Sequence, residues 1–319
     1  MNSHIFLAFA GALVYHRPVE EIFATPRKEH TMIEFLKAVL FGIVEGITEW
    51  LPVSSTGHII LLNSNELTKL NISEAFYDLF EIVIQLGAIL AVLVLFFHKL
   101  NPLSPRKDSV QKKNTWKLWM KVIAAVLPSA VIGLAFDEKL DGFLRGTPVL
   151  GTDLNTVVVS AALILYGIAF LFVEKANAKK DFRITEVDQI DYKTALLIGA
   201  FQCLSLIPGT SRSGSTILGA IVLGVSRSAG AEFSFFLAIP TMLGASALKL
   251  LKFLLEGAAP TGTEIMVLIT GCVVSFLVSI AVIKGLMEYV RKHSFAVFGV
   301  YRIVLGILVL GYFALWAFL

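Results

Sequence analysis

Long apolar runs separated by short polar segments dominate the pattern of this chain. A helix that spans a bilayer needs about 20 mostly apolar residues. Six stretches meet that requirement: 79–97, 118–136, 155–173, 229–248, 263–283 and 295–319. Two further stretches, 33–62 and 194–225, are apolar but interrupted by Pro, Gly and hydroxyl residues. Because a bilayer tolerates non-helical backbone only where protein or a water-filled cavity surrounds it, we interpret both as broken or re-entrant helices.

The two interrupted stretches resemble each other. Residues 42–57 align without gaps on residues 199–214, an offset of 157, so that Ser54 matches Ser211 and Ser55 matches Arg212. Each half of the chain then holds one broken hairpin and three spans. Because three is an odd number of crossings, the second half is inverted relative to the first, as in many transporters.

The distribution of Lys and Arg agrees with this inverted topology. If the first half starts outside, 15 Lys and Arg fall in the cytoplasmic loops 98–117, 174–193, 226–228 and 284–293. The external loops hold 5 of them, at 63–78, 137–154 and 249–262. This bias follows the positive-inside rule. It predicts that the two hairpins enter from opposite sides and meet near the midplane.

The sequence therefore predicts an all-α polytopic membrane protein with about six transmembrane helices and two re-entrant hairpins in an inverted repeat. We place the first repeat at 32–174, a cytoplasmic linker at 175–193 and the second repeat at 194–319, together one membrane domain. Residues 1–31 form an N-terminal extension to which we assign no role. Composition agrees, since 16% of the residues are charged, against about 25% in soluble domains.

Two carboxylates lie within the first interrupted stretch. Glu45 and Glu49 are four residues apart, so on a helix they share one face. Two carboxylates in apolar surroundings are not both charged at low cost, which favours a shared proton or a bound cation. A divalent ion with oxygen ligands, Mg²⁺ or Ca²⁺, suits the pair. The alternative is a surface helix with a solvated acidic face, which the apolar flanks disfavour.

The segment after these carboxylates is rich in hydroxyl groups. Ser54, Ser55 and Thr56 follow Pro52 and precede His58. A broken turn frees backbone N–H groups, and such a concave set of donors favours an anion such as phosphate. It also offers a nucleophilic hydroxyl near His58. The alternatives are an ordinary helix N-cap for the hydroxyls and a structural histidine.

The second hairpin contributes an arginine. Arg212 lies within 209–214, between Gly and Ser residues, and an arginine at membrane depth is usually functional. Its planar fork matches phosphate oxygens; the alternative is a snorkelling or salt-bridging side chain. Glu81, Gln85 and Glu232 could orient the hairpins or pack between helices, and we favour packing. Arg302 in the last span could pair with one of these acids.

The segments Glu45-Gly-Ile-Thr-Glu49, Leu51-Pro-Val-Ser-Ser-Thr-Gly-His58 and Pro208-Gly-Thr-Ser-Arg-Ser-Gly214 together resemble the signature of the undecaprenyl-diphosphate phosphatase, or bacitracin-resistance, family. The resemblance covers about 32–319. It implies hydrolysis of the C55 isoprenoid diphosphate to the monophosphate carrier for cell-wall synthesis. It also implies a divalent cation and a site toward the outer face of the bacterial cytoplasmic membrane. The functional residues it implies are Glu45, Glu49, Ser55, His58 and Arg212, with Ser54, Thr56, Ser211 and Ser213 in support.

We expect Arg212 to clamp phosphates, and Glu45 and Glu49 to hold the cation or to supply a base. Ser55 assisted by His58 is the preferred nucleophile, with His58 itself as the competitor, and the sequence does not choose. The expected partners are undecaprenyl diphosphate and the lipid bilayer, with no nucleic acid and with a homodimer left open. The alternative function is a transporter or flippase of a phosphorylated lipid or an anion, which would not need the carboxylate pair.

Overall fold

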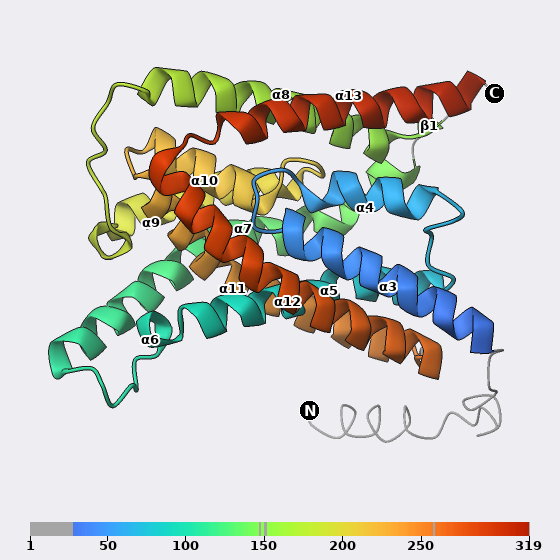
Figure 1. Cartoon of the computed structure of the whole chain (residues 1–319), viewed down its shortest axis with the longest axis horizontal. Coiled ribbons are helices and arrows are strands. Elements are labelled where there is room, and N and C mark those ends of the chain that lie inside the picture. The colour runs from blue at the N-terminus through green and yellow to red at the C-terminus, as the bar shows by residue number, and fades with distance from the viewer. Residues whose placement is uncertain (1–27, 147, 150–151, 258, 319) are drawn as a thin grey trace.

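The computed structural model describes residues 28–318 apart from 147, 150–151 and 258 (Figure 1). Residues 1–27 of the predicted N-terminal extension lie outside the described residues. Within the described part, all elements are helical except two strands of two residues each, β1 (Pro148–Val149) and β2 (Thr152–Asp153), which pair antiparallel. The predicted all-α class is therefore confirmed.

Six helices of the described part are long and apolar enough to cross a membrane. They are α5 (Glu74–Leu95), α7 (Ser109–Gly146), α8 (Leu154–Asn177), α11 (Arg227–Leu255), α12 (Gly262–Lys292) and α13 (Ala296–Phe318). Each overlaps one of the six predicted spans, so the polytopic membrane architecture is confirmed. Four of them, α7, α8, α11 and α12, contain the whole predicted span and extend beyond it, because their ends carry polar residues that a hydropathy pattern leaves out. Helix α5 ends at Leu95, before the predicted end at 97, and α13 begins one residue after the predicted start at 295.

Both interrupted stretches are broken hairpins, as predicted. In the first, α3 (Lys28–Thr48) and α4 (Ser55–Ser64) are joined by a turn. In the second, α9 (Tyr192–Gln202) continues into the short 3₁₀ helix η2 (Cys203–Leu206), and a turn leads to α10 (Arg212–Val222). Figure 1 shows the two hairpins at opposite ends of the molecule, with their turns meeting in the middle.

The contacts between helices are symmetric with respect to the two halves of the chain. Helix α3 packs on α12, and its counterpart α9 packs on α7; α8 pairs with α13, and α5 with α11. Each of these contacts maps onto another, or onto itself, when the halves are swapped, as an approximate two-fold relation requires. The boundaries of the repeats and of the linker remain a prediction.

Glycines at equivalent positions permit the two hairpin contacts. A Cβ on Gly42 of α3 would lie 2.8 Å from the carbonyl oxygen of Gly271 in α12. A Cβ on Gly199 of α9, which Gly42 matches in the repeat, would lie 2.0 Å from the carbonyl oxygen of Ala125 in α7. Small residues let helix backbones approach closely in membranes. The repeat therefore preserves a packing device as well as a motif.

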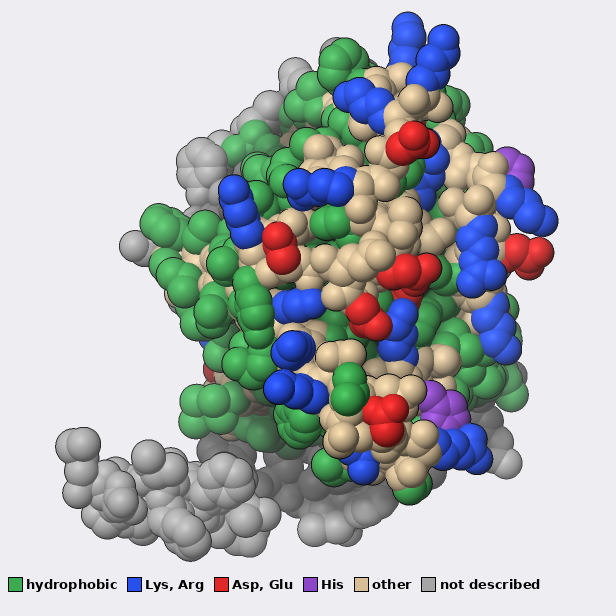
Figure 2. Space-filling view, turned by 90° about the vertical axis from the view of Figure 1, so that its left-hand side faces the viewer, with side chains coloured by type: hydrophobic (Ala, Val, Ile, Leu, Met, Phe, Trp, Pro, Cys, Tyr) green, Lys and Arg blue, Asp and Glu red, His purple; other side chains and the backbone are tan. Residues whose placement is uncertain are grey.

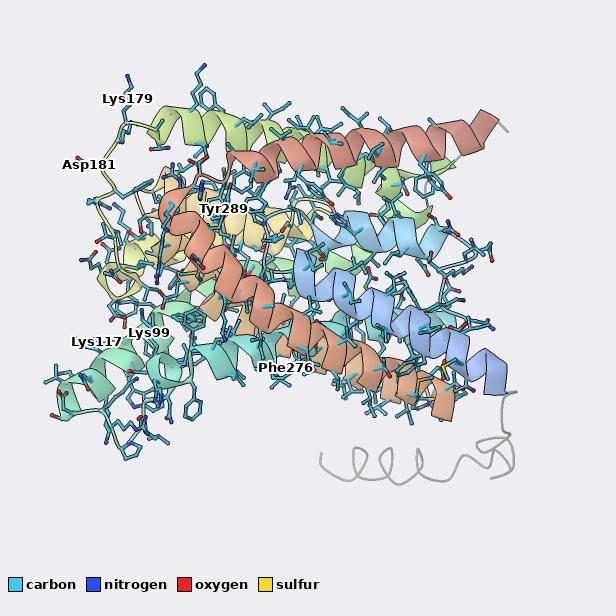
Figure 3. The ribbon with its side chains drawn as sticks, viewed as in Figure 1. Lys99, Lys117, Lys179, Asp181, Phe276 and Tyr289 are labelled. Atoms are coloured by element: carbon cyan, nitrogen blue, oxygen red, sulfur yellow. The ribbon has the colours of Figure 1, made fainter. Side chains whose placement is uncertain are left out.

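Charged side chains gather at one end of the molecule, which Figure 2 views directly. Figure 3 shows Lys99, Lys117, Lys179 and Asp181 at this end, in the loops predicted to be cytoplasmic. Here the short helix α6 (Phe97–Leu100) carries Lys99, whose Nζ lies 2.7 Å from Glu232 Oε1 of α11. The 3₁₀ helix η1 (Val187–Gln189) lies in the linker between α8 and α9.

A buried carboxylate ties three elements together at the same end. Glu174, near the end of α8, is 4% exposed and accepts hydrogen bonds from Nε and Nη2 of Arg227 in α11. Its Oε1 also accepts the backbone N–H of Phe295, at 2.8 Å, in the connection between α12 and α13. This contact joins the first half of the chain to the second.

Candidate active site

Both hairpin turns pass through a serine in the left-handed region. Ser54 has φ 70° and Ser211 has φ 68°, and they are the non-glycine residues with positive φ among those described. Such conformations are strained for L-residues and persist where the surroundings impose them. Ser211 caps α10, since its Oγ accepts the N–H of Gly214 at 3.1 Å. Ser54 makes no cap bond, and its buried Oγ has no hydrogen-bond partner.

The end of α3 and the start of α10 bring the predicted carboxylates and arginine together. Arg212 Nη2 donates to Glu49 Oε1 at 3.1 Å, and Nη1 donates to the carbonyl oxygen of Ser234 at 2.7 Å. Glu45 and Glu49 are 2% and 6% exposed, on one face at the end of α3. Because burial disfavours two charged carboxylates side by side, we expect the pair to hold a proton or a bound cation.

Ser55 contacts a carboxylate rather than the histidine. Its Oγ lies 3.4 Å from Glu49 Oε2, a long hydrogen bond that makes Glu49 the nearest group able to accept the serine proton. His58 makes different contacts: Nδ1 lies 2.8 Å from the carbonyl oxygen of Ser54, and Nε2 lies 2.6 Å from Tyr301 Oη. The expected assistance of Ser55 by His58 is therefore not the arrangement in this structure.

The hydroxyl groups of the second turn hold the hairpins together. Ser213 is fully buried, and its Oγ lies 3.0 Å from the carbonyl oxygen of Glu49 and 3.2 Å from that of Leu51. Ser211 Oγ lies 3.1 Å from Ser213 Oγ. Ser213 thus joins the second turn to backbone carbonyls of the first turn. Thr56 is half-buried in the first turn of α4.

Arg302 of α13 joins both turns, and the expectation that it pairs with an acid was wrong. The side chain is fully buried; Nη1 donates to Pro52 O at 3.1 Å, and Nη2 donates to Gly209 O at 2.8 Å and Thr210 O at 3.0 Å. Pro52 and Gly209 are equivalent in the repeat. Buried carbonyls released by a helix break must find donors, and one guanidinium supplies them to both turns. An arginine at membrane depth was the sequence signal for this role.

The carboxylate pair fits a divalent ion only in part. Among the described residues, no group of three or more His, Cys, Asp and Glu side chains could hold a metal ion. Glu45 Oε1 is buried without a hydrogen-bond partner, whereas both oxygens of Glu49 contact Arg212 and Ser55. Mg²⁺ is commonly bound by one or two carboxylates, with waters and substrate phosphates as its remaining ligands. The donor set suits such an ion and not one held by protein ligands alone.

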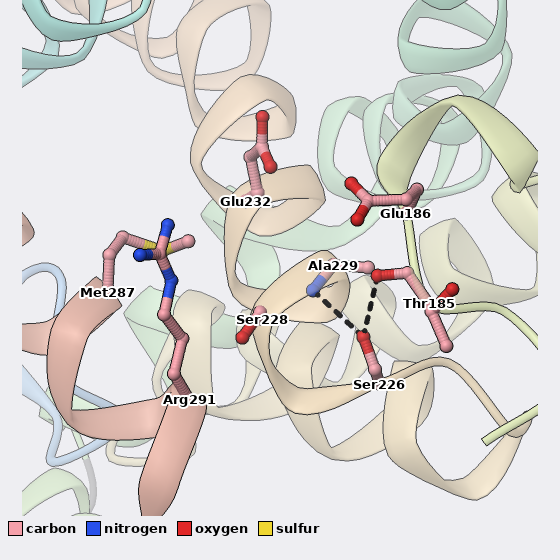
Figure 4. Close-up of a pocket in the computed structure, with 8 residues that line it drawn as sticks. All are labelled: Thr185, Glu186, Ser226, Ser228, Ala229, Glu232, Met287 and Arg291. Atoms are coloured by element: carbon pink, nitrogen blue, oxygen red, sulfur yellow. Dashed lines mark hydrogen bonds between the residues drawn. The ribbon is translucent and has the colours of Figure 1, made fainter. Parts of the chain in front are cut away.

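A cavity of about 340 Å³ lies elsewhere, at the ends of α11 and α12 and beside the linker (Figure 4). Its lining residues are Thr185, Glu186, Ser226, Ser228, Ala229, Glu232, Met287 and Arg291. None of them is a predicted site residue. Glu232 is held there by its ion pair with Lys99, in agreement with a packing role. We therefore assign this cavity no part in the candidate site.

Comparison with known proteins places this site in a family. The model of the family described as bacitracin resistance protein BacA matches residues 38–308. The chain belongs to the BacA family. An undecaprenyl-diphosphatase of Lactiplantibacillus plantarum is 54% identical over 284 residues, 89% of this chain and 99% of that protein. Undecaprenyl-diphosphatase 1 of Clostridioides difficile is 57% identical over 285 residues, 89% of this chain and 98% of that protein.

The BacA match confirms the resemblance drawn from the two motifs. All residues of the candidate site, from Glu45 to Arg302, lie inside the matched range. The predicted N-terminal extension at 1–31 lies before it. The roles of the individual side chains remain predictions, which the geometry above constrains.

Proposed function

We propose that this BacA-family protein is an integral membrane phosphatase that hydrolyses undecaprenyl diphosphate to undecaprenyl phosphate and inorganic phosphate. The relatives named above as undecaprenyl-diphosphatases support this reaction. The single observation that carries the proposal is the Arg212–Glu49 pair, 3.1 Å apart, beside a second buried carboxylate where the two hairpins meet. Such a site recognises a phosphorylated head group at membrane depth.

Arg212 is the group that recognises the diphosphate. Its side chain is 10% exposed, so its attraction for a phosphate oxygen is weakly screened by water. Both Nη atoms are held by Glu49 and Ser234, which fixes the orientation of the fork before the substrate arrives. Phosphoryl transfer needs little more than positioning and stabilisation of the charge on the phosphate oxygens. A preoriented arginine supplies both.

Ser55 is the nucleophile that the geometry favours, with Glu49 as its base. The Ser55 proton passes to Glu49 as Oγ attacks the terminal phosphorus, and the bond to the bridging oxygen breaks. The lipid monophosphate leaves, and water then cleaves the phosphoserine to release phosphate. The ion pair with Arg212 favours ionised Glu49, which can therefore accept the serine proton. A Mg²⁺ or Ca²⁺ ion at Glu45 and Glu49 would neutralise charge on the phosphate oxygens.

The cellular setting is part of the same proposal. We place the protein in the bacterial cytoplasmic membrane, with the Lys- and Arg-rich end of Figure 2 in the cytoplasm, because positive loops favour that side. We also place the site toward the outer face, and propose that the reaction recycles the lipid carrier for cell-wall synthesis and confers bacitracin resistance.

Phosphate release in detergent tests the proposed reaction. The purified protein is given a polyprenyl diphosphate with Mg²⁺ or Ca²⁺, and inorganic phosphate is measured over time. Arg212→Ala should lower the rate by about 10² or more, the loss expected when a preorganised charge-stabilising group is removed. Arg106→Ala, at an exposed arginine of the charged end, is the matched control. Absence of release by the wild type, or full activity in Arg212→Ala, contradicts the proposal.

A transporter or flippase is the second candidate function. It is favoured because each hairpin packs on a helix of the opposite half, and many transporters are built from such inverted repeats. Detergent micelles have no two compartments, so transport alone releases no phosphate there. A protein that is inactive in detergent but moves the labelled lipid diphosphate between leaflets of a vesicle would therefore be a transporter.

A further inference from the structure

Tyr301 of α13 contacts the imidazole ring of His58 in α4, although 243 residues separate them. The two rings are stacked, with centroids 5.6 Å apart and planes 9° from parallel. The tyrosine hydroxyl lies 2.6 Å from His58 Nε2. His58 is thus held through its face and through its edge at once.

The partners of His58 fix its tautomer. A carbonyl oxygen only accepts hydrogen bonds, so the 2.8 Å contact with Ser54 O places the proton on Nδ1. In the neutral ring Nε2 is then an acceptor, and Tyr301 Oη is the donor. Nε2 is the nitrogen that would take a proton or attack phosphorus, and in this structure the tyrosine hydroxyl covers it.

We propose that Tyr301 is a positioning residue that holds His58 in one orientation and keeps Nε2 engaged as an acceptor. This inference rests on the proposed function, since His58 binds the carbonyl oxygen of Ser54, next to the proposed nucleophile Ser55. The residue that follows Tyr301 in the sequence supports this positioning role. The next residue, Arg302, points into the protein and joins both turns, so one turn of α13 fixes the hairpins and the histidine together.

A variant that lacks only the Tyr301 hydroxyl distinguishes a positioning role of this residue from a packing role. Tyr301→Phe keeps the stacked ring, whereas Nε2 loses its donor. We expect kcat for phosphate release to fall about tenfold or more, as when an orienting partner of a functional histidine is removed, with KM within about twofold. Tyr312→Phe, a tyrosine further along α13 that contacts Phe313, is the matched control and should match the wild type.

The pH profile supplies a readout that a purely structural role would not move. Donation from Tyr301 favours neutral His58, so its loss lets the ring protonate at higher pH. The acid limb of kcat/KM should therefore move to higher pH in Tyr301→Phe, and to lower pH when 3,5-difluorotyrosine, a stronger donor of similar shape, stands at 301. Among the described residues, Arg302 is the charged group that faces His58, and both variants retain it.

Nitrogen NMR on protein labelled at its 6 histidines observes the contact itself, with His58 assigned from His58→Gln. The Nε2 signal should shift toward that of an unbonded acceptor in Tyr301→Phe. Wild-type kcat and pH profile in Tyr301→Phe would overturn the inference, whatever the NMR signal does. A wild type that releases no phosphate fails the proposed function instead, and the NMR signal still reports whether Tyr301 binds His58.

Discussion

Glu49 is the residue on which the most contacts of the site converge. It accepts from Arg212 and Ser55 through its two oxygens, and its backbone carbonyl accepts from Ser213. Its neighbour Glu45 keeps one buried oxygen without a partner. The sequence predicted that these carboxylates share a face, because a spacing of four residues fixes this on any helix. It did not distinguish their roles, since the difference depends on partners in the second hairpin.

Replacement of Glu49 by Gln should remove the base and leave the shape. We expect kcat for phosphate release to fall by about 10²–10⁴, the usual contribution of a positioned general base. Arg212 is also left without its buried counter-charge, so thermal stability in detergent should fall. Glu66→Gln, at an exposed position, is the control. Wild-type kcat in Glu49→Gln would assign the base elsewhere.

The hydrogen bonds of Arg302 to the two turns should contribute strongly to the stability of the protein. Arg302→Met keeps much of the apolar stem but leaves three buried carbonyls, those of Pro52, Gly209 and Thr210, without donors. Each orphaned group costs about 1–3 kcal/mol, so the unfolding temperature should drop well below that of the wild type. Thermal unfolding in detergent measures this. An unchanged transition would mean that water reaches the turns.

At the scale of elements, the pattern of apolar residues located the six spans and both interruptions, because helix length and helix-breaking residues are local properties. The register between helices was not predictable. Gly42 and Gly199 stood out only as members of the aligned segments, and nothing local indicated that they contact α12 and α7. His58 and Tyr301 likewise carry no shared motif, since their contact spans the two repeats.

The glycine contacts predict an order of stability among three alanine variants. Gly199→Ala would place a Cβ 2.0 Å from Ala125 O, so α9 and α7 must separate, at a cost of about 1–3 kcal/mol. Gly42→Ala, at 2.8 Å from Gly271 O, should destabilise less. Gly244→Ala in α11, where nothing lies within 4 Å, should be neutral or stabilising. Thermal unfolding ranks the three, and equal stability of Gly199→Ala and Gly244→Ala would refute the contact.

The whole molecule is two halves that each complete the other. Each hairpin packs on a helix of the opposite half, α3 on α12 and α9 on α7. The ion pair of Glu174 with Arg227 adds a contact between halves at the charged end. The predicted inverted topology anticipated hairpins that meet, because the count of crossings and the loop charges determine it. The partners of each hairpin had to come from the structure.

Division of the chain tests this interdependence. The connection around Lys179 and Asp181 is exposed and non-helical, so the chain can be expressed as 1–180 and 181–319. We expect neither fragment alone to release phosphate from the lipid diphosphate, and the two together to restore activity. The assay is performed on membranes from cells that express one or both fragments. Activity in a single fragment would show that one hairpin suffices.

Because Arg302 contacts both turns, its late position in the chain affects when the site can form during synthesis. The ribosome makes Arg302 250 residues after Pro52, and 93 residues after Gly209. Until α13 enters the bilayer, both turns lack the donor that joins them. We therefore expect a nascent chain that ends before Arg302 to contain Glu45, Glu49, Ser55, His58 and Arg212 without the donor that holds the two turns together. Activity on the lipid carrier should then require synthesis of the final helix.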